Sequence, residues 1–434
     1  MVMLFSWLIR SNLLKNSIIY TITDGISKGF AFLALPLVSH YLIPQELGIA
    51  ANFDVLQSIV CLLAGQAMVN SMPYFYYGKT KQEKASIVSH LVFIVLVANI
   101  FISIPIILFT GDLNHYLHIG LSLQLMTIVL VVSQLVGNLD LILYRLEERP
   151  YIFATLQIIQ TVVYFSLLIL FVVDLRLNAL GKILSGVVAY AAMSVVHIVL
   201  LWRRGYLKAR FCMADFSMLI RFGIPLLPHS LSFWFKSGFD KIIITSFCGL
   251  TMNGLYSMAL SFGAMYSIFN TAFSNSFIPY LQKRINEFTS ENQEQEKMGI
   301  VRLSYKIMAI FLLLSIAVDI FCWLVVKYIL DVQYADCYQF IPWIILGLTI
   351  YSMYGLVIQY PYSVKKTLGL GIITFTGSIV QFLLTYILIS EIGIDGIKIS
   401  YVLGSLIIMI GVWIYSNYVY PMPWFSCKIL KRNL

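Results

Sequence analysis

The sequence predicts an all-α integral membrane protein with about twelve transmembrane helices in two parallel-repeat six-helix lobes around a central cavity. Of its 434 residues, 60% are hydrophobic and only 11% are charged, whereas soluble domains carry about 25% charged residues. Apolar segments recur at the roughly 20 residues that a helix needs to cross a bilayer. These segments do not alternate polar and apolar positions, which argues against a membrane β-barrel.

Twelve spans are expected, and no connection between them exceeds about 22 residues. The sixth and seventh are separated by the polar segment 203–218, near the middle of the chain. We therefore expect an N-terminal lobe at 1–210 with helices 1–6 and a C-terminal lobe at 211–434 with helices 7–12. The expected spans are 17–40, 48–72, 86–109, 119–144, 151–173, 179–202, 218–248, 253–281, 303–330, 337–361, 368–390 and 397–420.

The basic residues are divided unequally between alternate loops. Of the 29 Lys and Arg, twenty fall on the side that holds both termini, four on the other side, and five within spans. Because basic loops remain cytoplasmic, both termini are expected inside the cell. The net charge of +9 thus reflects topology, and no nucleic-acid partner is expected.

The two halves of the sequence resemble each other weakly at one fixed offset of 206 positions. At this offset Gly48 corresponds to Gly254, and the segment Pro73-Tyr74 corresponds to Pro279-Tyr280. Six spans separate the copies, so both run through the membrane in the same direction. This is the pattern of a parallel repeat with a substrate site between its halves, as in transporters.

The first and seventh spans each contain a Lys and an Asp four positions apart, which places both on one helix face. These are Asp24 and Lys28 in the first span, and Lys236 and Asp240 in the seventh. The two charges of each pair could simply neutralise each other so that the helix can insert into the membrane. Because the pairs occur in repeat-related helices, we favour the interpretation that they line a cavity. Lys241 has no local partner, since residue 237 is a serine, and either joins the cavity or extends to the interface.

Further ionisable residues lie within the expected spans, where charges are costly and commonly functional. Asp54, Asp140 and Asp319 are candidates for ion coupling or charge balance, together with Asp24 and Asp240. A structural hydrogen bond between helices is the alternative for the three. For His90 and His197 the structural hydrogen bond is the favoured interpretation.

Catalytic and metal-binding motifs are not found in the sequence. The six cysteines are scattered, which suggests neither a disulfide framework nor a zinc site. No P-loop, HExxH or GxSxG occurs. We therefore expect no enzyme activity, no cofactor and no metal, and a transporter driven by a gradient.

One segment resembles a known family. In 219–259, "LIRFGIPLLPHSLSFWFKSGFDKIIITSFCGLTMNGLYSMA", three phrases occur in order: Phe222-Gly223-Ile224-Pro225-Leu226-Leu227-Pro228, Asp240-Lys241, and Gly254-Leu255-Tyr256-Ser257. They resemble the start of the second half of the polysaccharide-transport proteins, the O-antigen flippases of the multidrug/oligosaccharidyl-lipid/polysaccharide exporter superfamily. The first 80 residues are similar to the opening of the same family.

The resemblance implies a role in lipopolysaccharide biosynthesis at the bacterial inner membrane. Such flippases move an undecaprenyl-pyrophosphate-linked oligosaccharide from the cytoplasmic to the periplasmic leaflet by alternating access. Lys28, Lys236 and Lys241 would then bind the pyrophosphate. Membrane lipids, and the polymerase and chain-length proteins of the pathway, are candidate partners, and H⁺ or Na⁺ is the candidate counter-ion.

Other classes of protein remain as alternatives. A cation-coupled multidrug exporter of the same superfamily is the nearest; the excess of Lys over Asp in the two matched helices favours an anionic cargo instead. A lipid II flippase would usually have more than twelve spans. A membrane-embedded glycan polymerase generally needs a large periplasmic loop, and the outer loops here are short.

Overall fold

The computed structural model describes residues 12–207, 211–227, 230–231, 234, 238–286, 293–364 and 366–425. These residues are almost entirely helical, and eleven of their helices are long and apolar enough to cross a membrane. This confirms the all-α membrane fold. The remaining expected span, 218–248, falls partly outside the described residues.

The chain divides by its internal contacts into two compact units, Met1–Gly254 and Leu255–Leu434. The lobe boundary expected between residues 210 and 211 stays a prediction.

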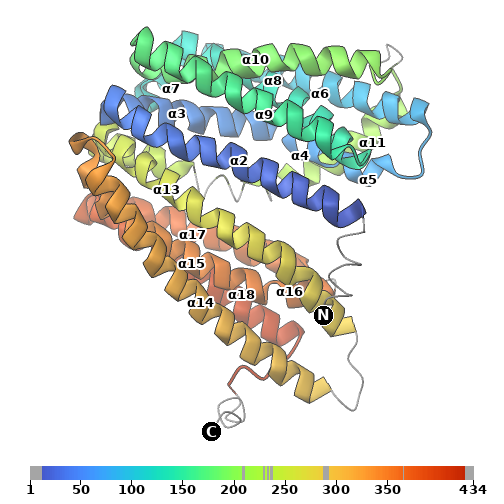
Figure 1. The fold of residues 1–434 in the computed structure, drawn as a ribbon, viewed down its shortest axis with the longest axis vertical. Helices are drawn as coiled ribbons and strands as arrows, with labels where there is room; N and C mark the ends of the chain where they lie inside the picture. The colour runs from blue at the N-terminus through green and yellow to red at the C-terminus, as the bar shows by residue number, and fades with distance from the viewer. Residues whose placement is uncertain are drawn as a thin grey trace. The chain divides into compact units, whose positions relative to one another are not determined.

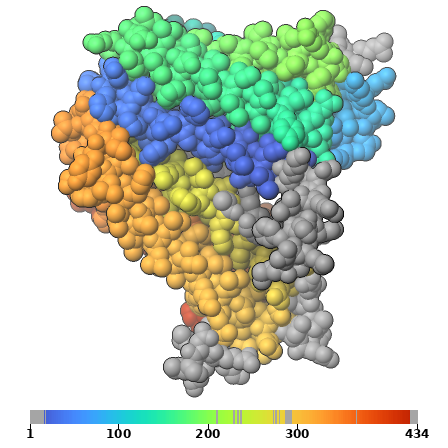
Figure 2. Space-filling view, viewed as in Figure 1, coloured from blue at the N-terminus to red at the C-terminus, as the bar shows by residue number. Residues whose placement is uncertain are grey.

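In the N-terminal unit, α2 packs against α9, and α10 packs against both α8 and α9. Figure 1 shows this group, and Figure 2 shows the outer faces of α2, α9 and α10 as adjoining bands. The helices are α2 (Asn12–Tyr41), α3 (Pro44–Cys61), α4 (Ala67–Asn70), α5 (Met72–Tyr76), α6 (Lys81–Leu108), α7 (Thr110–Leu117), α8 (Leu121–Leu146), α9 (Pro150–Leu168), α10 (Asn178–Arg203) and α11 (Met213–Gly223), with π-helical turns at Leu62–Gln66 and Ile169–Asp174 and a 3-10 turn at Ile224–Leu226.

In the C-terminal unit, α18 packs against α15 and α17, and α14 packs against α15. The helices are α13 (Phe239–Asn286, which begins in the N-terminal unit), α14 (Gln293–Tyr328), α15 (Ile341–Val357), α16 (Gln359–Ser363), α17 (Leu368–Ile392) and α18 (Asp395–Val419), with a 3-10 helix at Val332–Gln339.

Local sequence signals account for several helix ends and breaks. Thr80 and Glu83 form a reciprocal capping box at the start of α6, which satisfies two backbone donors there. α13 is interrupted at Gly249, whose φ of 85° and ψ of 171° are not helical. Only glycine adopts this backbone region readily, so the break between the expected spans 218–248 and 253–281 is encoded at this position.

A buried amide joins three segments of the N-terminal unit. Asn52 on α3 is fully buried, and its Nδ2 donates to the carbonyl of Leu117 at 2.8 Å. Its Oδ1 accepts from Thr245 Oγ1 at 3.1 Å and from Asn253 Nδ2 at 2.8 Å. Because a buried amide is costly unless it is hydrogen-bonded, this cluster fixes the start of α13 against α3.

Candidate functional site

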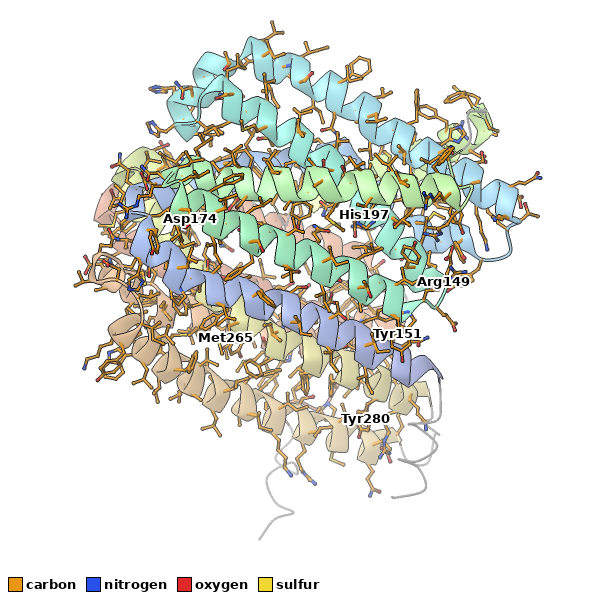
Figure 3. All side chains as sticks on the ribbon, turned by 45° about the horizontal axis from the view of Figure 1, so that its top comes forward. Arg149, Tyr151, Asp174, His197, Met265 and Tyr280 are labelled. Atoms are coloured by element: carbon orange, nitrogen blue, oxygen red, sulfur yellow. The ribbon has the colours of Figure 1, made fainter. Side chains whose placement is uncertain are left out.

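The N-terminal unit contains an open cavity of about 630 Å³ between α2, α3, α8, α9 and α10. Its lining contains six side-chain amides, which are Gln57, Gln66, Gln134, Asn138, Gln157 and Gln160, and the hydroxyls of Ser27, Ser133, Thr161, Tyr164 and Tyr190. Figure 3 labels Arg149 and Asp174 at opposite ends of the α9 segment, and His197 on α10 near the Arg149 end. Polar groups in a membrane helix bundle commonly face such a cavity.

One charged group of the lining joins α2 to α8 and α9. Asp24 Oδ1 accepts a hydrogen bond from Gln157 Nε2 at 2.9 Å and lies 3.6 Å from Arg145 Nη2. Both charged side chains are about half exposed, at 45% for Asp24 and 46% for Arg145. The Arg145 guanidinium also lies 4.4 Å from the centre of the Phe153 ring. Asp24 therefore pairs across helices with Arg145, and no ion pair with Lys28 is observed between these two described side chains.

A second charged group lies between α3 and α10. Asp54 Oδ2 is 4.0 Å from Lys182 Nζ, and both residues line the cavity. Lys241 is partly buried and is not part of the lining of this cavity.

A buried network joins α8 to the end of α10. Asp140 is fully buried; its Oδ2 lies 2.8 Å from His197 Nδ1, and its Oδ1 accepts from Arg204 Nη1 at 2.7 Å. Arg204 also donates to Glu147, which accepts a further hydrogen bond from the Tyr206 hydroxyl at 2.6 Å. Burial, reinforced by the hydrogen bond to this carboxylate, raises the pKa of Tyr206. Its phenol therefore stays protonated and serves as a donor.

The remaining predicted site residues are placed separately. Lys28 is exposed and is not part of the cavity lining. Lys236 lies outside the described residues. Asp240 is buried, at 3% exposure. In the C-terminal unit, Asp319 accepts a hydrogen bond from the Tyr338 hydroxyl at 3.0 Å, and burial together with this bond raises the pKa of Tyr338 to about 12.

Both histidines that were expected to be structural make hydrogen bonds between segments. His90 Nε2 accepts from the backbone N–H of Cys212 at 2.9 Å, and its Nδ1 lies 2.7 Å from the Ser86 carbonyl. His197 binds Asp140, as described above. No group of three His, Cys, Asp or Glu that could hold a metal ion occurs in the described part of the chain.

Sequence reasoning missed Arg145, Arg204 and the amides on α8 and α9. Both arginines were counted only as cytoplasmic loop charges, because they directly follow the expected spans. In the structure Arg145 lines the cavity, and Arg204 binds the buried Asp140. A helical projection of 119–149 could have revealed the signal, since Gln134, Asn138 and Arg145 recur at intervals of four and seven residues.

Comparisons with known proteins support the fold. No family model matches the chain. The sequence is 23% identical over 371 residues to the "Lsg locus putative protein 1" of Haemophilus influenzae, a match that covers 81% of this chain and 85% of that protein.

Two solved structures share this architecture over most of their length. A multidrug resistance MATE family transporter of the MOP superfamily, in its inward-facing conformation, superposes with a TM-score of 0.73 at 15% identity, covering 90% of this chain and 94% of that one. The lipid II flippase MurJ, in an inward closed conformation, superposes with a TM-score of 0.72 at 14% identity, covering 92% and 87%. The chain is therefore a multi-pass membrane protein with the fold of the MATE and MurJ transporters.

Proposed function

We propose that this protein is a flippase that moves an undecaprenyl-pyrophosphate-linked O-antigen or polysaccharide repeat unit across the bacterial inner membrane. The observation that carries the proposal is the amide-rich lining of the cavity in the N-terminal unit. Amides and hydroxyls both donate and accept hydrogen bonds, so they match the hydroxyl groups of a glycan. A fold shared with a lipid II flippase is consistent with a lipid-linked cargo.

Charge in the cavity favours this cargo over a cationic drug. Two carboxylates, Asp24 and Asp54, are each balanced by a cation, Arg145 and Lys182. A site for a cationic drug would need an uncompensated negative charge. We assign the glycan to this cavity and the pyrophosphate to the ammonium groups of Lys28, Lys236 and Lys241, which would act as point charges.

The transport cycle proposed here is alternating access of two lobes, 1–210 and 211–434, with both termini in the cytoplasm and the lipid tail left in the bilayer. Asp24, Asp54, Asp140, Asp240 and Asp319 supply charge balance or ion coupling, with H⁺ or Na⁺ as counter-ion. No covalent chemistry is required of the protein. The polymerase and chain-length proteins of the pathway would receive the product.

The test is complementation of a bacterial strain that lacks its O-antigen flippase, read as surface glycan per unit of membrane protein. We expect the wild type to restore the glycan, and Lys28→Ala, Lys236→Ala and Asp240→Ala to reduce it. Lys81 is exposed, so Lys81→Ala is the matched control and should restore as much surface glycan as the wild type. Full activity of all three variants would contradict the proposed roles of Lys28, Lys236 and Asp240.

A multidrug exporter is the second candidate, because the fold is equally that of a MATE transporter. The same cells distinguish the two functions. If expression of the protein raises resistance to cationic drugs and leaves the surface glycan unchanged, the protein is a multidrug exporter and the proposed flippase function is wrong.

A further inference from the structure

One ring nitrogen of His197 has no hydrogen-bond partner in the part of the chain that the structure describes. The residue is 1% exposed, and its Nδ1 is bonded to Asp140. Its Nε2 is buried and has no hydrogen-bond partner among the described residues. The ring lines the cavity and lies over Gly137, where a Cβ would come within 3.6 Å of Nε2. Leaving a buried polar atom unpaired is unfavourable, so this nitrogen requires a partner from the cavity.

The neighbours of His197 fix the tautomer of its neutral form. Asp140 is held by the Arg204 guanidinium at 2.7 Å, and a carboxylate beside a permanent cation accepts hydrogen bonds only. The hydrogen on the His197 ring must therefore lie on Nδ1, pointing at Asp140. Nε2 then carries a lone pair, which can accept a hydrogen bond from a donor in the cavity or take up a proton.

The charges of the buried network leave room for one more positive charge. Asp140 and Glu147 are two anions, and Arg204, whose side chain is 16% exposed, binds both. Arg149 lies 3.5 Å from Glu147, but its side chain is 56% exposed, so water screens its charge. A proton on His197 would bring the buried network to neutrality.

The other ionisable groups around α10 already have partners. Tyr144 lies under the Arg204 guanidinium, 4.1 Å from it, and Tyr206 donates to Glu147. The remaining charged groups of the cavity are the pairs Asp24–Arg145 and Asp54–Lys182. Each cavity carboxylate thus has a cation, whereas His197 Nε2 is an acceptor without a donor.

We propose that His197 Nε2 is the proton-binding site of this cavity and carries the coupling proton. A hydronium ion in the cavity transfers its proton to Nε2, so that an N–H bond forms and a water molecule remains. Nδ1 keeps its own hydrogen, which stays hydrogen-bonded to Asp140. The acceptor becomes a cationic donor that faces the cavity, where it can bind an oxygen of an anionic cargo. The role in coupling rests on the proposed flippase function, whereas proton binding itself does not.

The experiment is nitrogen-15 NMR of histidine-labelled protein in lipid nanodiscs, titrated from about pH 8 to about pH 5, the range in which histidine changes charge. We expect one histidine to begin as the Nδ1–H tautomer, and its Nε2 signal to shift to that of a protonated nitrogen as the pH falls. His197→Gln should remove this titrating signal. If that variant does not fold, substitution of the other five histidines one at a time assigns the signal by elimination.

His90 is the matched internal control, because it is also buried and both of its ring nitrogens are within hydrogen-bond distance of partners. His90→Gln should remove a signal and leave the titration of His197 intact. A His197 signal that keeps one form throughout the range, or a neutral form with the hydrogen on Nε2, would overturn the proposal.

Proton binding and flippase function are separated by the complementation strain. If His197 titrates while the wild type restores no surface glycan, proton binding stands, and both the cargo and the coupling role fall. If the wild type restores glycan while His197 does not titrate, the flippase stands and the proton site falls.

Discussion

Gly48 and Gly254 occupy equivalent positions of the 206-residue repeat and make reciprocal close contacts. A Cβ on Gly48 would lie 2.1 Å from the carbonyl oxygen of Leu250, and a Cβ on Gly254 would lie 1.7 Å from that of Pro44. Leu250 is itself the repeat equivalent of Pro44. The contact of Gly48 with Leu250 and that of Gly254 with Pro44 are therefore equivalent under the offset of 206 positions. This contact supports the parallel repeat that the sequence suggested.

The first prediction concerns this contact, where two backbones leave no room for a side chain. Gly48→Ala and Gly254→Ala should each destabilise the fold by about 1–3 kcal/mol, since neither backbone carbonyl can move aside freely. Thermal unfolding in detergent, followed by size-exclusion chromatography, measures the effect. Gly25→Ala and Gly29→Ala on α2 are the controls, because a Cβ there meets nothing within 4 Å. If the Gly48 and Gly254 variants were as stable as the Gly25 and Gly29 variants, the close backbone contact would be contradicted.

The membrane class and the helix ends could be predicted because they depend on local signals. Hydropathy, the capping box at Thr80 and the glycine at 249 act within a few residues of the chain. Pairings between distant helices could not be predicted, because no repeating pattern in the sequence relates Asp24 to Arg145 or Asp140 to Arg204. The expected partner of Asp24 was Lys28, one turn away; tertiary packing instead offers it Arg145 on another helix.

The second prediction concerns the buried network that ends at Arg204. Arg204→Ala leaves the fully buried Asp140 without its arginine and leaves Glu147 with the exposed Arg149 alone, which should cost about 3–5 kcal/mol of stability. Arg203→Ala is the matched control, because this neighbouring arginine is exposed. Unfolding temperature of the purified protein is the measurement. Adding Glu147→Gln to Arg204→Ala removes one unpaired anion and should recover part of the loss; a further loss would argue against the network.

The third prediction concerns Arg145 at the cavity wall. Its pair with Asp24 is half exposed, so the pair adds little to stability. Arg145→Ala should therefore fold normally yet lower glycan export by about tenfold, the value of one charge-assisted hydrogen bond from Arg145 to a hydroxyl group of the glycan. Arg145→Lys keeps the charge without the planar fork and should be intermediate. Surface glycan per unit of membrane protein is the measurement; wild-type export by Arg145→Ala would exclude a role in cargo binding.

The fourth prediction separates structural amides of the cavity from those that serve the cargo. Gln57 Nε2 donates to Gln134 Oε1, and both side chains line the cavity. Replacing Gln57 alone by Leu removes one donor from Gln134 and should cost about 1 kcal/mol. The double variant Gln57→Leu, Gln134→Leu removes both polar partners, so stability should return toward that of the wild type.

Transport should respond differently from stability in these two variants. A glycan loses hydrogen-bonding groups in both, so export by the double variant should fall at least as far as export by the single one. Unfolding temperature and surface glycan measured side by side give the comparison. If export recovers in the double variant together with stability, the two amides serve the fold alone. If export stays low while stability recovers, Gln57 and Gln134 act on the cargo, because no loss of folding remains to explain the defect.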